Sequence, residues 1–527
     1  MKQHNRRGRP LITFHNVTLQ VRDRRILQHM DWCIRSDEHW AIVGANGSGK
    51  SVLARALYGA VPAVEGEIEY HFLSRRKFRA GKGTFRGPEN FIAHVSFEDQ
   101  RRLIGMESSY HQSRWNSIDA DGTLTVRDVL SSDAASASPP RRSPGTQADG
   151  KRQRRMVKQL GIDHLLDRKI MRLSNGEVRK ALIAKALLQS PLILMLDDPF
   201  VGLDYHSKRT LRRIIGELMN GNMRIVFVTS RIDEIPSGIT HVLRLEGGRM
   251  AAAGKRKTVL DDVRSVKPSM CRKRTPAIRQ IRAAPSNHAS LKPKALIEVR
   301  NASVIYDGIE VLRKVNWMVQ AGQNWALLGP NGSGKTTLLS LILADNPQAY
   351  SNDIYVFGRK RGSGESIWDI KKKIGWVSPE IQIHYQKGMT SYAIVCSGFF
   401  DSIGLYRRCS ARQMCLASSC METLGLSRLA DRRYDELSSG QQRMVLIARA
   451  SVKNPRLLIL DEPCQGLDPE NRRLVLEAVD VVGRRSGSVL IYVTHHLDEI
   501  PESTTHVLRL RKGRVVGKGE RIRVLGE

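Results

Sequence analysis

Long hydrophobic runs are missing from this chain of 527 residues. Its longer apolar stretches, such as residues 192–196 (LILML) and 489–493 (VLIYV), have the length of buried strands. A membrane-spanning helix needs roughly 18 to 20 consecutive apolar residues, so we expect none here. With 41% hydrophobic and 26% charged residues, the composition indicates a globular protein of more than one domain.

Cysteine is scarce and scattered. The seven cysteines include no CxxC pair, and the spacing of Cys409, Cys415 and Cys420 matches no metal motif. We interpret them as structural thiols in a reducing compartment. The first ten residues are basic but have no apolar segment, and a strand-like segment begins at residue 11. We therefore expect no cleavable targeting peptide, and a cytoplasmic location is the default.

Acidic residues are too few to balance the basic ones. The chain has 85 Lys and Arg but only 52 Asp and Glu, which gives a net charge of +33. Most of the excess lies in residues 1–10, 71–90, 131–160 and 251–295, which carry +4, +5, +5 and +10. Such segments are usually solvated rather than part of a folded basic surface. Their contact with RNA, other phosphate-rich surfaces or anionic lipid is an alternative, and specific nucleic-acid binding is not favoured.

The chain contains an internal repeat. GANGSGKS at 44–51 returns as GPNGSGKT at 329–336, LSNGE at 173–177 as LSSGQ at 437–441, and LILMLDDP at 192–199 as LLILDEP at 457–463. The first pair is offset by 285 residues and the others by 264, so the first half has 21 extra residues. The expected organisation is a basic tail (1–10), a first domain (11–250) with a disordered insert (131–155), a basic linker (251–295) and a second domain (296–527).

Each half shows the same coarse pattern of elements. A β-meander comes first, then a strand, a glycine loop and a helix, then a mostly helical middle (about 101–172 and 385–436), then strand, helix and strand. This order predicts an α/β core with an attached helical subdomain in each half.

The GxxxxGK[ST] loops predict phosphate binding. Glycines let backbone N–H groups turn toward a phosphate at a helix N-terminus, the lysine reaches the β- and γ-phosphates, and the final hydroxyl can bind Mg²⁺. The residues assigned to nucleotide binding are Gly44, Asn46, Gly47, Ser48, Gly49, Lys50 and Ser51 in the first half, and Gly329, Pro330, Asn331, Gly332, Ser333, Gly334, Lys335, Thr336 and Thr337 in the second.

A carboxylate ends a buried apolar strand in each half. Asp197 and Asp461 are expected to bind the metal, and the next residue is where a general base for an attacking water would lie. That residue is Glu462 in the second half and Asp198 in the first. Aspartate withdraws the carboxylate by about 1.5 Å, and a misplacement of about 1 Å can cost on the order of 100-fold in rate.

The LSxGx segments precede long helices (178–188 and 442–452) and form a second anion-binding element. Its residues are Ser174 and Gly176 in the first half, and Ser438 and Gly440 in the second. Alone, such a serine would be a plain helix N-cap. Its place some 20 residues before the aspartate, in both halves, favours a functional role.

These motifs, in this order and twice, resemble the ATP-binding-cassette (ABC) superfamily across nearly the whole chain. The resemblance implies ATP and Mg²⁺ as ligands, ATP hydrolysis, and two tandem P-loop NTPase domains, each with a RecA-like core, an antiparallel β-subdomain and a helical subdomain. It also implies head-to-tail pairing of the halves. Site one would then join Lys50, Ser51 and Asp197 to Ser438 and Gly440, and site two Lys335, Thr336 and Asp461 to Ser174 and Gly176.

The resemblance assigns further roles. Tyr306 is implied to stack on adenine, and Val21 stands in its place in the first half. The histidine that contacts the γ-phosphate is His495, where the first half has Ser230.

The glutamines implied to approach Mg²⁺ are Gln100 and Gln382, with Glu98 and Glu380 as rivals. Site two thus keeps its catalytic groups, Glu462, His495 and Lys335. Site one lacks the aromatic residue, the histidine and the longer carboxylate, which predicts an ATP-holding, slowly hydrolysing site. The alternative is neutral drift at a site that is still active.

Segments such as SFEDQ (96–100), SRIDEIP (230–236) and, above all, residues 347–378 resemble the ModF-type tandem ATPases, which are associated with molybdate transport. The resemblance implies a motor for a separate membrane permease, with molybdate or another small anion as cargo, and a cytoplasmic protein peripheral to a membrane. Asp198 and the 21-residue insert depart from that family's pattern. The alternative is a non-transport cytosolic ATPase that acts on ribosomes, RNA or DNA.

Overall fold

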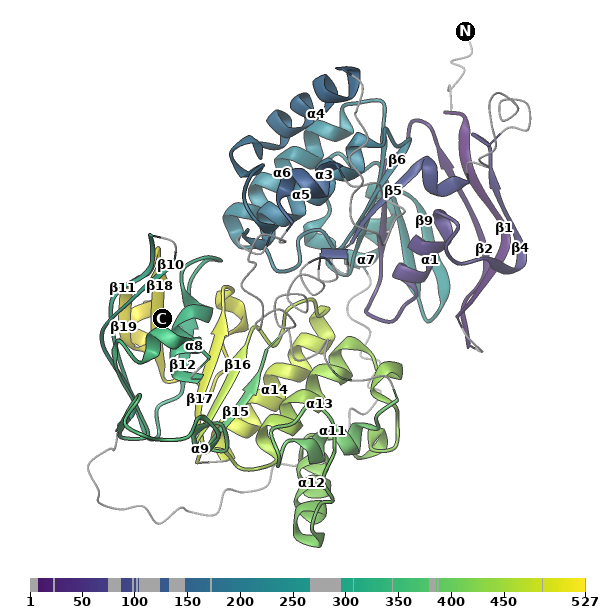
Figure 1. The fold of residues 1–527 in the computed structure, drawn as a ribbon. Coiled ribbons are helices and arrows are strands. Elements are labelled where there is room, and N and C mark those ends of the chain that lie inside the picture. Colours follow the sequence, from purple (N-terminus) through teal and green to yellow (C-terminus); the bar gives the residue numbers. More distant parts are fainter. Residues whose placement is uncertain are drawn as a thin grey trace. The chain divides into compact units, whose positions relative to one another are not determined.

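The computed structural model describes residues 8–21, 24–73, 87–96, 99–100, 103, 124–131, 147–170, 173–265, 295–306, 308–343, 345–378, 385, 388–485 and 487–526. The chain divides into two units, Met1–Ser269 and Met270–Glu527. In each unit a six-stranded sheet lies between an antiparallel sheet and a group of helices (Figure 1). Among the described residues, no helix combines the length and the apolar character that crossing a membrane requires.

The first unit has two sheets. The antiparallel sheet has the order β2-β1-β4 and the larger sheet the order β5-β6-β7-β3-β8-β9, parallel except between β8 and β9. The strands are β1 (Pro10–Val21), β2 (Arg24–Arg35), β3 (Trp40–Val43), β4 (Ala63–Tyr70), β5 (Ile92–Ser96), β6 (Ile193–Asp197), β7 (Arg224–Thr229), β8 (His241–Glu246) and β9 (Arg249–Lys255). The helices are α1 (Lys50–Leu57), α3 (Val126–Ser131), α4 (Gln147–Leu160), α5 (Asn175–Leu188), α6 (Tyr205–Met219) and α7 (Arg256–Ser265).

The second unit repeats this plan. Its antiparallel sheet has the order β11-β10-β13-β14 and its larger sheet the order β15-β16-β17-β12-β18-β19. The strands are β10 (Ala295–Tyr306), β11 (Ile309–Gln320), β12 (Trp325–Leu328), β13 (Asp353–Val356), β14 (Arg359–Lys360), β15 (Ile374–Val377), β16 (Leu457–Asp461), β17 (Val489–Thr494), β18 (His506–Arg511) and β19 (Arg514–Glu520). The helices are α8 (Lys335–Leu343), α9 (Ile367–Lys371), α11 (Ser391–Ser397), α12 (Ala411–Thr423), α13 (Ser439–Ser451), α14 (Pro469–Arg485) and α15 (Arg521–Leu525).

The central strands are apolar without alternation because both faces of the larger sheet are covered. In β16, Leu458 and Leu460 pack with the helices, whereas Leu457 and Ile459 pack with the antiparallel sheet. All five residues of β16 are buried. A continuous apolar run is what a parallel sheet covered on both faces requires. The expected α/β fold with two tandem domains is confirmed.

Two expected boundaries are wrong. The linker does not begin at residue 251, because β9 pairs with β8 as far as Lys255, opposite His241, and α7 follows directly. Val259 of α7 is buried in the core of the first unit. The expected disordered insert is also too long at its C-terminal end, since α4 begins at Gln147 and buries Leu160. Residues 132–146 lie outside the described part of the chain.

Candidate active site

Each glycine loop connects a buried strand to a helix. The loop after β3 leads into α1, and the loop after β12 leads into α8. The Lys50 ammonium donates to the carbonyls of Gly44 and Ala45 at 2.8 and 2.9 Å. The Lys335 ammonium donates to those of Gly329 and Pro330 at 2.7 and 3.2 Å. Both cations are therefore held over the loop, where they can exchange a carbonyl for a phosphate oxygen.

The shape of each loop depends on the glycine that directly precedes its lysine. Gly334 has φ +98°, and a Cβ there would lie 2.5 Å from Leu312 Cδ2. Gly49 has φ +100°, with Leu27 Cδ2 at 2.8 Å. These positions favour glycine on both conformational and steric grounds, so the loop is built to bring its backbone N–H groups close to a ligand.

Polar atoms in the loops fit a triphosphate. The buried hydroxyls of Ser48 and Ser333 have no hydrogen-bond partner among the described residues. Buried polar groups of this kind normally have a partner, so they point to a ligand. Ser51 and Thr336, the predicted Mg²⁺ ligands of the loops, are exposed at the start of α1 and α8, so their hydroxyls are open to a bound ion.

The carboxylates follow the same backbone path in both units. Asp197 ends β6 and Asp461 ends β16, and both are buried. The next residues, Asp198 and Glu462, adopt left-handed conformations, with φ +46° and +44°. Their N–H groups donate to the carbonyls of the neighbouring strand at 2.9 Å. Strain of this kind at both positions is typical of functional residues.

In the second unit, three side chains surround the expected general base. His495 Nδ1 lies 3.0 Å from Glu462 Oε1, and Gln465 donates to Oε2 at 3.1 Å. Burial raises the pKa of Glu462, but the hydrogen bond and charge of His495, with Lys335, outweigh it and hold that pKa below its ordinary value. Glu462 is therefore ionised at neutral pH, as a base must be. His495 Nε2 is buried without a partner among the described residues, so it can meet a phosphate.

The first unit lacks this arrangement. Burial raises the pKa of Asp198 to about 6, with the Glu234 carboxylate adding to the rise, while Lys50, the Ser230 backbone N–H and Arg179 oppose it. Ser230 stands where the second unit has His495 and provides no side-chain cation. Burial disfavours the charged form of Asp198, but a carboxyl group with a pKa of about 6 is still largely ionised at neutral pH. The first unit therefore differs from the second in the missing imidazole and in the shorter side chain of Asp198.

The serines of both LSxGx segments cap helices. Ser174 and Ser438 accept from the N–H groups of Glu177 and Gln441, at 3.3 Å in each case, as parts of capping boxes at the starts of α5 and α13. Each helix starts three residues earlier than expected, directly after the serine. A Cβ on Gly440 would lie 2.1 Å from the side chain of Asn471 on α14, so this glycine is also needed for packing. The cap is shown, and a phosphate-binding role remains a prediction.

Gln100, which is predicted to approach Mg²⁺, is hydrogen-bonded to α5 in this structure, and its role at the metal stays a prediction. Its Oε1 accepts from Arg179 Nε at 2.9 Å, and its Nε2 donates to Asn175 Oδ1 at 3.0 Å. Both ends of the amide are therefore engaged by α5. Gln382, with its rival Glu380, and Glu98 lie outside the described residues.

Sequence reasoning missed two residues near the first carboxylates. Arg179 is fully buried and also donates to the Asp198 carbonyl at 3.4 Å, while burial lowers its pKa to about 10. His94 Nε2 lies 4.0 Å from Asp197 Oδ2, and its ring stacks on Tyr58. The LSNGEVRK repeat contains the signal for Arg179, because Arg443 recurs at the same offset of 264.

Tyr306, the residue predicted to stack on adenine, ends β10 and is 45% exposed. Its hydroxyl accepts from Asn346 Nδ2 at 2.8 Å, which fixes the ring while leaving a face available. Val21 occupies the end of β1 in the first unit.

The different carboxylate settings predict opposite responses to pH. We expect Asp198→Asn to raise the midpoint of thermal unfolding above pH 6 and to have no effect below pH 4. Because the pKa rises from 3.8 to about 6 on folding, ionised Asp198 costs stability as pH increases through this window. The cost is at most about 3 kcal/mol. Thermal unfolding followed between pH 4 and 8 measures it.

Glu462→Gln is the matched comparison. The pKa of Glu462 is lowered on folding, so its ionised form stabilises the folded state above the ordinary glutamate pKa, and this contribution is lost as pH falls. The Glu462→Gln substitution should therefore lower the midpoint at neutral pH. A shift in the same direction for both variants would contradict the two environments described above.

Comparison with known proteins identifies the family of this chain. The ABC transporter family profile matches residues 27–201 and 312–465. The ABC transporter ATP-binding protein ModF of Escherichia coli is 37% identical over 494 residues, which cover 93% of this chain and 95% of that protein. An uncharacterised ABC transporter ATP-binding protein of Schizosaccharomyces pombe is 29% identical over 516 residues, covering 96% and 99%. The structure of cbiO1 from Clostridium perfringens, part of the ABC transporter complex cbiONQ, matches with 26% identity and a TM-score of 0.40, covering 44% of this chain and 92% of that one.

The chain therefore belongs to the ABC transporter ATP-binding family, with two ABC domains in tandem. It is an ATP-binding protein and an ATPase, and its sequence is similar to that of ModF along almost the whole length of both chains.

Proposed function

We propose that the chain hydrolyses ATP-Mg²⁺ at two composite and unequal sites. The observation that supports the inequality is a contrast at matching positions of the repeat. Glu462 contacts His495 and Gln465, whereas the shorter Asp198 has Ser230 in place of the histidine. The second unit thus has a base that is positioned by a histidine, and the first unit lacks that histidine and has a shorter carboxylate.

Each residue of the second unit has a role that follows from its position. Lys335 neutralises charge on the β- and γ-phosphates, Glu462 polarises the attacking water, and His495 holds the γ-phosphate through Nε2. Thr336 and Asp461 would hold Mg²⁺, which, when bound, neutralises charge on the phosphate oxygens. Tyr306 stacks on the adenine. In the first unit, Lys50, Ser51 and Asp197 bind ATP with little hydrolysis.

The two units act head to tail, so that Ser174 and Gly176 complete the site of Lys335, and Ser438 and Gly440 complete that of Lys50. This proposal follows from the family to which the chain belongs. It accounts for a serine and a glycine at the start of α5 and of α13, where backbone N–H groups and the helix dipole attract an anion.

A substitution at Ser174, in the first unit, should therefore lower ATP hydrolysis at the site of the second unit. We expect Ser174→Arg to lower ATP turnover at least about tenfold, because it fills the space for the γ-phosphate at the Glu462 site. Ser438→Arg should have a smaller effect on turnover. Steady-state phosphate release measures both, and Ser174→Thr, which keeps the capping hydroxyl, is the control. Equal losses for Ser174→Arg and Ser438→Arg would contradict the assignment.

Closure of the two halves on ATP would drive a separate membrane permease, with a small anion such as molybdate as cargo. The resemblance to ModF supports this role, and so does a stretch of exposed apolar side chains in the helical subdomain of the second unit. Ile403, Tyr406, Met414 and Leu416 lie before and within α12, with exposed fractions of 42–73%. Several large apolar side chains exposed within one short segment are consistent with a protein interface there.

Cell fractionation tests the partner. If the permease proposal is correct, the protein should pellet with membranes, and nuclease should not change its sedimentation. The Tyr406→Glu substitution should release it from the membranes. If the protein instead sedimented with ribosomes and nuclease treatment abolished this, the permease proposal would be wrong. The alternative, an ATPase that acts on RNA, would then take its place.

A further inference from the structure

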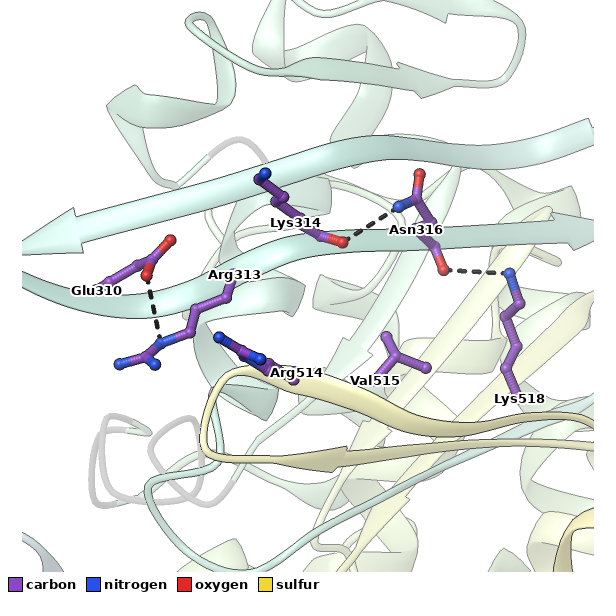
Figure 2. Close-up of a pocket in the computed structure, with 7 residues that line it drawn as sticks. All are labelled: Glu310, Arg313, Lys314, Asn316, Arg514, Val515 and Lys518. Atoms are coloured by element: carbon purple, nitrogen blue, oxygen red, sulfur yellow. Dashed lines mark hydrogen bonds and ion pairs between the residues drawn. The ribbon is translucent and has the colours of Figure 1, made fainter.

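A basic cleft of about 630 Å³ lies in the second unit, between β11 of the antiparallel sheet and β19 of the larger sheet. Figure 2 shows Glu310 and Arg313 on the β11 side, and Arg514, Val515 and Lys518 on the β19 side. Lys314 and Asn316 complete the lining, and the Lys314 side chain points away from β19 at the rim (Figure 2). A volume of this order is typical of small-molecule sites.

The lining is suited to charge rather than to apolar contact. Four of its seven side chains are basic, one is acidic, and only Val515 is apolar. Such a lining has little to offer a hydrophobic ligand and attracts an anion. None of the seven residues belongs to the glycine loop, the strand-end carboxylates or the helix caps of the ATPase site.

The cations are available to a ligand. The guanidinium of Arg514 has no hydrogen bond or ion pair within the described part of the chain. Arg313 pairs with Glu310 at 3.3 Å, but both side chains are about 40% exposed, so the pair is weak. Among the residues that the structure describes, Lys518 Nζ donates only to the backbone carbonyl of Asn316, at 3.3 Å. A bidentate phosphate can therefore recruit Arg313 and Arg514 without breaking a strong internal bond.

The cleft adjoins the phosphate loop of the same unit. Gly513, which precedes Arg514, donates its N–H to the carbonyl of Ser333 in that loop at 3.1 Å and accepts from the Arg313 N–H at 2.9 Å. Its φ is +75°, and a Cβ at this position would lie 2.3 Å from the Val311 carbonyl oxygen, so only glycine fits there. One backbone turn thus supports both the cleft and the loop.

The repeat supplies an internal comparison. The same backbone bond exists in the first unit, where the Gln28 N–H donates to the Gly248 carbonyl at 3.1 Å. The side chains differ, however: Gln28 and Ala253 stand where the second unit has Arg313 and Lys518, and only Arg249 matches Arg514. The fold therefore does not require these cations, and their concentration in one unit calls for a separate explanation.

We propose that this cleft is a second anion site, which binds a small ligand that carries two or more neighbouring phosphate groups. Arg313 and Arg514 lie at one end of the cleft and Lys518 lies further along β19 (Figure 2). Two arginines from two strands, with a lysine along the same cleft, suit adjacent phosphates better than a single oxyanion, and an open, polar cleft suits a metabolite that remains partly solvated.

Tripolyphosphate is a suitable probe, studied by isothermal titration calorimetry at low salt. It also binds glycine loops, so the titration uses the full-length chain with Lys50→Ala and Lys335→Ala in every sample. On this background we expect one binding site, and Arg514→Ala with Lys518→Ala should weaken it about tenfold or more. The matched control, Arg249→Ala in the first unit, should change the affinity less than about twofold. Orthophosphate should bind more weakly than tripolyphosphate.

Three results would overturn the proposal: no tripolyphosphate binding at millimolar concentration, the same affinity with and without Arg514 and Lys518, or the same loss with Arg249→Ala. A single-stranded RNA oligonucleotide serves as the comparison ligand. If RNA binding depended on Arg514 and Lys518 while tripolyphosphate did not bind, the cleft would be a nucleic-acid contact and the proposal of a small ligand would be wrong. Unchanged circular dichroism spectra would establish that the variants fold.

Discussion

Glu462→Gln should lower steady-state ATP hydrolysis roughly 1,000-fold while ATP binding is retained. The substitution keeps the shape of the side chain but removes the ionised carboxylate that we propose as the base, and general-base catalysis contributes on the order of 100- to 10,000-fold. Gln465 and His495 can still hydrogen-bond the amide, so the geometry should survive. Phosphate release and the count of nucleotides retained after rapid desalting measure the two effects.

Asp198→Asn is the matched control in the first half. Because the Asp198 carboxylate is one methylene shorter and Ser230 replaces the histidine of the second half, we expect this variant to lose less than about twofold in turnover. A loss comparable with that of Glu462→Gln would mean that the two sites are equivalent. Unchanged turnover in both variants would mean that the measured hydrolysis does not come from this protein.

The parts of the site that the sequence predicts well are those built from consecutive residues. Lys50 and Lys335 lie over their loops because a glycine-rich turn after a buried strand leaves few other conformations. Asp461 and Glu462 likewise follow from a strand that ends at a fixed residue. The motif places His495 one residue after a buried threonine. The structure shows it 3.0 Å from Glu462, while its contact with the γ-phosphate stays a prediction.

The parts that the sequence does not predict depend on contacts between distant segments. The distance of Gln100 from a strand predicts a place near Mg²⁺, which stays a prediction, but it does not predict the hydrogen bond with Arg179, which is 79 residues away in the sequence. A buried guanidinium needs acceptors, and the Gln100 side-chain carbonyl is one that it finds. The spacing of residues along the sequence does not predict this long-range contact.

The misplaced linker has a similar cause. Residues 251–255 (AAAGK) have a weak strand propensity, and the basic, proline-containing segment that follows indicates a linker. The backbone bonds to β8 and the burial of Val259 determine the true boundary. Pairing with an existing strand overrides propensity in short segments of this kind.

Lys335→Ala should weaken ATP binding at the catalytic site by at least about 100-fold, since it removes the cation that meets the β- and γ-phosphates inside a partly buried loop. Turnover should fall in parallel, because the proposed first site hydrolyses little. Lys50→Ala is the matched variant. It should remove the retained nucleotide of the first site and leave a larger part of the turnover.

The effects of these two lysine substitutions distinguish between two mechanisms. If the first site holds ATP as a structural ligand, the parent protein should retain nucleotide after desalting, Lys50→Ala should retain none, and Lys335→Ala should retain as much as the parent. If the sites alternate as equal partners, both variants should lose turnover and retention to the same extent. Because Lys50 and Lys335 have the same backbone contacts, a difference between the variants would come from Asp198, Ser230 and the other residues around each loop.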